Sequence, residues 1–278
     1  MPKQLIVNAD DFGRHTLINR AVEQGVARGL IRSATVMVTG AAFAEAVELA
    51  RRTPALGMGI HFTLVNARPV LPAAEIPSLV DPATGELYPD HGAFVKRFLT
   101  GKIRLQDVKR ECTAQLDRFL DMGLVPTHAD SHQHMHVLPG IIDIILDLCL
   151  DHGIPAVRIP SIPVSLLATR PSNLGEQVGR TGLHVLAERA RKKARALGIQ
   201  APGHFGLVNK FWTQFKIFLD SQSVNFGHQF HSLDKGVKLI RYHSCSDSYC
   251  PNPLFQDGTF PGTALALNSQ GSKRAVLH

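Results

Sequence analysis

The feature that most constrains the fold is a mostly apolar stretch at residues 5–9 that ends in two adjacent carboxylates, Asp10 and Asp11, and then Gly13. Charge at the tip of a predicted strand is typical of α/β enzymes, which keep their chemistry at the carboxyl ends of strands. Adjacent residues of an extended backbone point to opposite faces, so we expect one carboxylate to face a metal and the other to face substrate or solvent. The simpler alternative is that Asp10 caps a helix that begins near His15.

Strands and helices alternate after this opening strand. The predicted helices carry apolar residues at helical spacing, and the predicted strands are short apolar runs. This order predicts an α/β fold with a parallel sheet, either open or closed into a (β/α) barrel. The expected segments are helices at 15–28, 41–52, 93–99, 107–122 and 140–150, and strands at 33–38, 57–62 and 156–159.

A long connection separates the third strand from the next helices. Residues 66–92 are rich in Pro, Ala and Asp and have no sustained periodicity. Connections of this length in a compact domain are usually functional lids or binding loops. We therefore expect this segment to form part of a substrate cleft.

Residues 127–136 (THADSHQHMH) repeat chelating side chains with a period of two, so on a strand they would share one face. A core strand would fill that face with Val and Ile, so this composition indicates a role other than packing. We expect one of them to bind a metal, the others to orient it or contact substrate, and the chain to curl before Pro139. The alternative is a polar strand edge or a chance cluster. The residues are His128, Asp130, His132, His134 and His136.

His61 lies near the end of the predicted strand at 57–62, and a lone histidine there is usually structural. If the strands are parallel, however, the Asp10/Asp11 pair, His61 and His128 all lie at carboxyl ends, where one ion could bind to them. One carboxylate and two imidazoles leave positions for water, which is typical of a catalytic rather than a structural metal site.

Four motifs in this order resemble the YdjC-like carbohydrate deacetylases: NADDFG at 8–13, GIHFTL at 59–64, THADSHQHMH at 127–136 and VRIP at 157–160. The resemblance covers roughly residues 3–207. The segment PGHFGL at 202–207 and the basic helix before it are most similar to the hopanoid-biosynthesis-associated branch of the family. The resemblance implies a distorted parallel (β/α) barrel and hydrolysis of N-acetyl groups on an amino sugar, free or lipid-linked. It also implies one divalent metal, usually described as magnesium, with zinc or another transition metal as the other option.

The resemblance also implies roles for individual residues. Matched by motif, Asp11, His61 and His128 are the metal ligands, and Asp10 is the catalytic base that takes a proton from water. Arg158 could orient Asp10 or a sugar oxygen, with a surface ion pair as the alternative. Arg158 is also a candidate for substrate contact. The candidates for substrate contact, or for the acid that protonates the departing amine, are His132, His134 and His204.

The chain departs from the family pattern after about residue 210. From Trp212 onward Ser, Gln, His and Asn replace Leu, Ala and Val, and a family strand that ends in His-Pro is missing. Three histidines inside this part of the chain are not followed by proline: they are His228, His231 and His243. We therefore divide the chain into a deacetylase barrel domain at 1–210 and a divergent segment at 211–278, typical of a frameshifted or strongly diverged tail. Such a tail could leave the barrel incomplete and the activity impaired.

Composition limits the partners. The net charge is +7 but aromatic residues are only 6%, and much of the positive charge lies at residues 189–195, so we expect no nucleic-acid partner. This basic segment is interpreted as a solvated helix face, with transient contact to an anionic membrane as the alternative. No run is long and apolar enough to span a bilayer, and we expect a cytoplasmic location. Cys112 and Cys149 are expected to be buried, reduced thiols on helices. The oligomeric state is left open.

Two other functions fit the same residues. A site of two imidazoles and one carboxylate also serves hydrolysis of other bonds, such as phosphoesters. The unusual tail also allows a glycan or lipid-headgroup binding protein that has lost catalysis.

Overall fold

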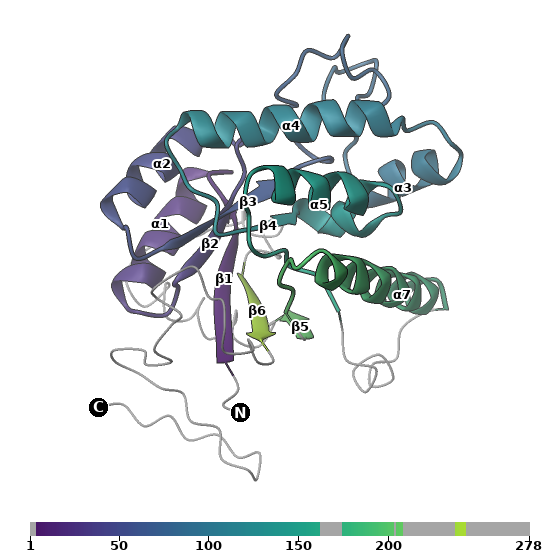
Figure 1. Ribbon diagram of the computed structural model, residues 1–278. Helices are drawn as coiled ribbons and strands as arrows, with labels where there is room; N and C mark the ends of the chain where they lie inside the picture. The colour runs from purple at the N-terminus through teal and green to yellow at the C-terminus, as the bar shows by residue number, and fades with distance from the viewer. Residues whose placement is uncertain (1–3, 162–173, 203, 208–236, 243–278) are drawn as a thin grey trace.

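The computed structural model describes residues 4–161, 174–202, 204–207 and 237–242 (Figure 1). Four parallel strands form its centre, and each of the first three is followed by a helix, as the alternating sequence pattern predicts. The strands are β1 (Gln4–Phe12), β2 (Ser33–Val36), β3 (Gly57–Phe62) and β4 (His128–Ser131). The helices are α1 (Thr16–Ala27), α2 (Phe43–Arg52), α3 (His91–Leu99), α4 (Leu105–Asp121), α5 (Ile141–Asp151) and α7 (Leu174–Ala196), with a 3-10 segment η1 (His132–Val137) after β4.

The sheet continues beyond the parallel strands on both sides. Next to β1 lies β6 (Val237–Tyr242), which runs antiparallel to it, and β5 (His204–Leu207) pairs antiparallel with β6. On the far side of β4, isolated parallel bridges join Ala129 to Val157 and Ala156 to Gln200. Gln200 lies four residues before β5, so the chain leads directly from these bridges to the strand at the other edge of the sheet, an arrangement typical of a distorted barrel. The predicted α/β barrel class is confirmed, and the predicted strand at 156–159 is reduced to these bridges.

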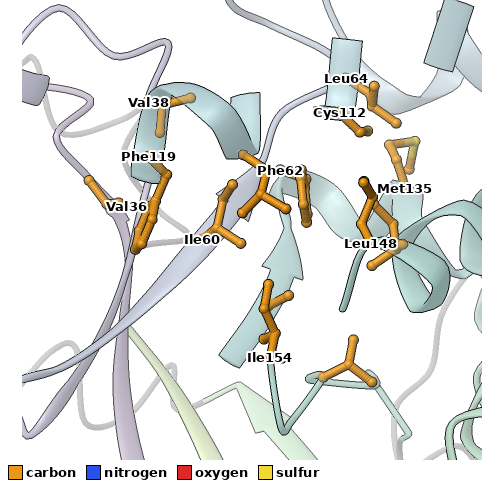
Figure 2. Close-up of a cluster of buried hydrophobic side chains, with 14 of the residues drawn as sticks. Val36, Val38, Ile60, Phe62, Leu64, Cys112, Phe119, Met135, Leu148 and Ile154 are labelled. Atoms are coloured by element: carbon orange, nitrogen blue, oxygen red, sulfur yellow. The ribbon is translucent and has the colours of Figure 1, made fainter. Parts of the chain in front are cut away.

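Apolar packing explains why the strands are the central layer. Every residue of β3 is buried, which is expected of a parallel strand covered on both faces. Figure 1 shows α1 and α2 on one side of the strands and α5 and α7 on the other. Figure 2 shows Phe119 of α4 beside Val36 and Ile60, all of them fully buried. Each such side chain contributes about 1.5–3 kcal/mol of hydrophobic stabilisation, so β2, β3 and α4 form a rigid base for the site.

The connection between β3 and α3 is pinned to α4. The Glu111 carboxylate accepts hydrogen bonds from the backbone N–H groups of Val70 and Leu71, at 2.8 and 3.1 Å. The Asp107 carboxylate accepts one from the N–H of Ser78 at 3.1 Å. Glu111 is fully buried, and burial raises the pKa of its carboxyl group. Residues 66–90, hereafter the wall segment, are therefore anchored to α4 and do not form a free lid.

Several smaller predictions can be compared with the structure. Cys112 and Cys149 are buried free thiols, which is confirmed. The polar strand is shorter than its period-two pattern predicts, because β4 ends at Ser131 and η1 follows at once. The boundary between 1–210 and 211–278 stays a prediction, and of the second part only β6 lies among the described residues, so His228, His231 and His243 lie outside them. Within the described ranges, no helix is both long enough and apolar enough to cross a membrane.

Candidate metal centre

A bulge near the end of β1 brings both of its carboxylates inward. The register of β1 against β2 shifts between Ala9 and Phe12, and Asp11 adopts a left-handed backbone with φ of 59°. An extra residue of this kind breaks the alternation of faces along a strand. Asp10 and Asp11 are consequently both buried, at 1% and 5% exposure, and neither faces bulk solvent as the simple alternation allowed. Left-handed conformations of residues other than glycine are concentrated at functional sites.

His61 of β3 has the arrangement of a metal-binding imidazole. Its Nδ1 lies 2.5 Å from Oδ1 of Asp130, the residue opposite it on β4. Its Nε2 is buried, lies 3.2 Å from Oδ1 of Asp11, and has no hydrogen-bond partner among the described residues. A carboxylate on one ring nitrogen orients the other nitrogen toward a metal in many such sites. The Nε2 atom of His61 is therefore the strongest indication of a ligand here.

The charges around His61 agree with this interpretation. Burial alone would lower its pKa, but the carboxylates of Asp130 and Asp11 raise it to about 9. For Asp11, burial alone would raise the pKa, but the neighbouring imidazoles of His132 and His61 hold it well below its usual value. Without a metal, His61 is therefore an imidazolium beside a carboxylate at neutral pH. A bound cation would replace the proton on Nε2.

His132 joins this pair. Its Nδ1 lies 2.8 Å from Oδ1 of Asp11, and its ring centroid is 5.7 Å from that of His61. Asp11, His61 and His132 each offer a ligand atom, and these atoms lie within 4.8 Å of one another. Asp10, His61 and Asp130 form a second such group, but Arg158 already binds both of its carboxylates. The first group is therefore the better cation site.

His128 lies in a different environment. Its Nδ1 is 2.9 Å from Oγ1 of Thr127, and its Nε2 is 3.2 Å from Oδ1 of Asn8 and 3.4 Å from Oγ of Ser33. A Cβ atom on Gly59 would lie 2.6 Å from the His128 ring, so the glycine makes room for it. Burial lowers the pKa of His128 to about 4, which keeps the ring neutral. His128 belongs to neither group of described ligand atoms, and the structure brings His132 to Asp11 and His61 instead.

Arg158 joins two carboxylates inside the protein. It is 2% exposed, its Nη1 and Nη2 lie 2.5 and 2.9 Å from the two oxygens of Asp10, and Nη2 is also 2.7 Å from Oδ2 of Asp130. The alternative of a surface ion pair is thus wrong. Burial alone would lower the pKa of Arg158, but Asp10 and Asp130 raise it. Once the proton on His61 is displaced, the buried charges of the described cluster are three carboxylates against one guanidinium, an imbalance that a divalent cation would offset.

The other histidines predicted to contact substrate, and the neighbouring His136, belong to neither group of ligand atoms among the described residues. His134 is partly buried in η1, with φ of 62°, and its ring lies 6.5 Å from that of His136. The side chain of His204 lies outside the described residues. His136 is buried between Oγ of Ser131 and the carbonyl oxygen of Arg158, at 2.6 and 2.8 Å, and so anchors the backbone of Arg158. This anchoring role and that of Asp130 are not visible in the sequence pattern, which places all these residues on one strand face.

Comparison with known proteins supports one family. The family described as YdjC-like protein matches residues 4–246. A carbohydrate deacetylase from Geobacillus stearothermophilus is 40% identical over 157 residues, which are 56% of this chain and 59% of that protein. A chitooligosaccharide deacetylase from Enterobacter sp. (strain 638) is 36% identical over 161 residues, covering 57% and 60%.

A solved structure shares the fold. It is a protein from Enterococcus faecalis V583 proposed to be a cellobiose-phosphate cleavage protein, with a TM-score of 0.52 and 28% identity over 71% of this chain and 65% of that one. The matched region thus spans less than two thirds of each of these relatives. Since the family match covers most of the sequence, from residue 4 to residue 246, the chain belongs to the YdjC-like protein family.

Proposed function

We propose that this protein is a metal-dependent hydrolase that removes N-acetyl groups from an amino sugar. The observation that carries the proposal is the buried Nε2 of His61, which faces Asp11 and has no hydrogen-bond partner among the described residues. Relatives named carbohydrate deacetylase and chitooligosaccharide deacetylase support the reaction and the substrate class.

The residues divide into three roles. Asp11, His61 and His132 would hold the cation, and Asp130 orients His61 through Nδ1. A divalent cation in such a site supplies a Lewis acid for the acetyl carbonyl and lowers the pKa of bound water. Asp10 is the proposed acceptor of the proton of the attacking water.

Arg158 and Asn8 position Asp10. The two hydrogen bonds from the Arg158 guanidinium fix the plane of the carboxylate, and Nδ2 of Asn8 donates a third bond to Oδ1 at 2.9 Å. A base that is already held in one orientation loses little further conformational entropy when it binds the attacking water. The family motif assigns the third ligand to His128, whereas the geometry favours His132, and variants of the two residues separate these proposals.

Acetate release tests the reaction. The metal-free protein would be incubated with an N-acetylglucosaminyl substrate and then with added Mg²⁺ or Zn²⁺. We expect acetate and a free amine in equal amounts, only when cation is present. Phosphate release from a phosphorylated disaccharide without acetate release would instead support a phosphoester hydrolase, and glycan binding with no turnover in either metal would support a binding protein.

The finer proposals concern the metal, the substrate and the location. The family resemblance favours magnesium, whereas two imidazole ligands suit zinc or another transition metal, so both belong in the assay. The similarity to the hopanoid-associated branch favours a lipid-linked amino sugar, reached by a cytoplasmic protein at the membrane surface. In α7, Lys193 pairs with Asp143 at 2.5 Å and Arg191 pairs with Glu188. Membrane contact would therefore depend mainly on Arg189, Lys192 and Arg195.

A further inference from the structure

The residue after His132 has a strained backbone and a long-range contact. Gln133 has φ of 53°, in the left-handed region that residues other than glycine rarely adopt. Its Oε1 accepts a hydrogen bond from the backbone N–H of His91 at 3.0 Å and lies 3.0 Å from the Nδ1 of His91. His91 is the first residue of α3 and directly follows the wall segment. A contact between residues 42 positions apart thus accompanies the unusual backbone.

The first turn of α3 needs such an acceptor. The first N–H groups of a helix have no partner within the helix. Asp90 accepts a hydrogen bond from the N–H of Ala93 at 2.8 Å, and Gln133 accepts the one from His91. Gln133 therefore acts as a second cap, supplied by the segment that carries His132. The cap ties the end of the wall segment to η1.

The other end of the Gln133 amide faces His132. Since the N–H of His91 must meet the oxygen of the amide, the amide nitrogen points the other way, and it lies 3.4 Å from Nε2 of His132. Nη1 of Arg14 lies 3.3 Å from the same Nε2. These two side chains contact Nε2 of His132, and the other ring nitrogen, Nδ1, faces Asp11. The amide thus fixes the orientation of His132 as well as the position of α3.

We propose that Gln133 is a positioning residue that couples the wall segment to the cation site through His132. The substrate side of this inference rests on the proposed deacetylation, whereas the coupling itself does not. Partners that orient a metal ligand typically change metal affinity by about 10- to 100-fold when they are removed. Coupling between two sites is reciprocal, so a cation at the site should also slow exchange of the α3 amides.

Three variants separate the two ends of the amide. Gln133→Ala removes both contacts. Gln133→Glu keeps an oxygen for the N–H of His91 but replaces the donor that faces His132. His91→Ala removes only the side-chain contact and is the matched control, since its backbone N–H still reaches Gln133.

Hydrogen exchange and cation binding are measured on the whole chain, with Mg²⁺ and, separately, Zn²⁺. In wild type we expect cation to slow exchange in the first turn of α3. Gln133→Ala should speed that exchange about tenfold, abolish its response to cation and weaken cation binding about tenfold or more. Gln133→Glu should keep the slow exchange but change cation affinity, because it replaces the amide NH₂ beside Nε2 of His132. His91→Ala should leave both cation affinity and the slow exchange unchanged.

Two results with the Gln133→Ala variant would overturn the inference, and a third, given below, concerns wild type. One is unchanged exchange at α3 in Gln133→Ala. The other is a uniform rise in exchange across the whole protein, which would indicate general destabilisation. Acetate release is scored separately. If cation protects α3 but no acetate forms, the proposed reaction fails and the coupling stands, whereas metal-dependent acetate release without protection of α3 refutes the coupling alone.

Discussion

Replacing Asp130 by Asn should change how stability depends on pH. Asp130 is fully buried, and its two oxygens contact Nδ1 of His61 and Nη2 of Arg158 at 2.5 and 2.7 Å. Asn has the same shape, but its NH₂ group must face one of these two donors. Removing one member of a buried charge network typically costs about 3–5 kcal/mol. The variant should therefore be about 3 kcal/mol less stable near neutral pH, as measured by urea unfolding of the metal-free protein.

The pH dependence has a definite sign. The pKa of His61 is 6.5 when unfolded and about 9 in the fold, so its stabilisation is complete below pH 6.5 and is lost as pH rises through 9. At about 1.4 kcal/mol per pKa unit, this histidine contributes roughly 3 kcal/mol, of which about 2 kcal/mol is lost between pH 6.5 and about 8.5. Because Asp130 is the main group that raises this pKa, the variant should lack most of that loss.

The measured quantity is the difference between wild type and variant. His128, His132 and His136 have lowered pKa values because they are buried, so their contribution rises as pH rises through 6.5 and opposes that of His61. Taking the difference at each pH largely cancels this background. We expect the destabilisation by Asp130→Asn to shrink by about 2 kcal/mol between pH 6.5 and about 8.5.

A surface variant provides the control. Asp143→Asn, which removes an exposed partner of Lys193, should show a small destabilisation that does not vary with pH in this range. A destabilisation by Asp130→Asn that is constant with pH, or that grows as pH rises, would refute the assignment of a raised pKa to His61. In wild type, cation at saturating concentration should abolish the loss of stability between pH 6.5 and about 8.5, because it displaces the proton from His61.

Three further outcomes are expected. Asp10→Asn should leave cation affinity in calorimetry nearly unchanged while suppressing turnover, whereas Asp11→Asn should weaken cation binding itself, and the reverse pattern would exchange their roles. Glu111→Ala should lower the free energy of unfolding in urea by about 1–3 kcal/mol and speed hydrogen exchange at Val70 and Leu71, because it leaves two N–H groups of the wall segment without their acceptor. Unchanged exchange at these two residues would show that packing alone holds the segment. Co-sedimentation with anionic vesicles should fall as salt rises, since each basic residue of α7 near the surface contributes about 1 kcal/mol, and no binding even at low salt would remove the membrane proposal.

The order of strands and helices follows from the sequence because apolar periodicity depends on local neighbours. The helix predicted at 107–122 is α4 at Leu105–Asp121, and the strand predicted at 57–62 is β3. The candidate carboxylates and His61 are also predictable, because the carboxyl ends of parallel strands meet at one edge.

The third proposed ligand was harder to predict. Its position depends on where β4 stops, and a period-two pattern continues past Ser131 while the backbone does not. Gln133 and His134 leave the strand with left-handed φ angles, which no feature of their residue types requires. The turn places His132 beside Asp11 and leaves His128 against Asn8. The bulge at Asp11 was missed for the same reason, since it depends on pairing with β2.

Cation binding by two single variants tests the central claim most directly. Equilibrium dialysis of the metal-free protein against Mg²⁺ or Zn²⁺ should give one bound ion per chain in wild type. His132→Ala should weaken this binding by about 100-fold or more, because it removes a ligand, while His128→Ala should bind with nearly wild-type affinity. Circular dichroism spectra should show that both variants are folded. Loss of binding in His128→Ala with full binding in His132→Ala would contradict the site built from Asp11, His61 and His132.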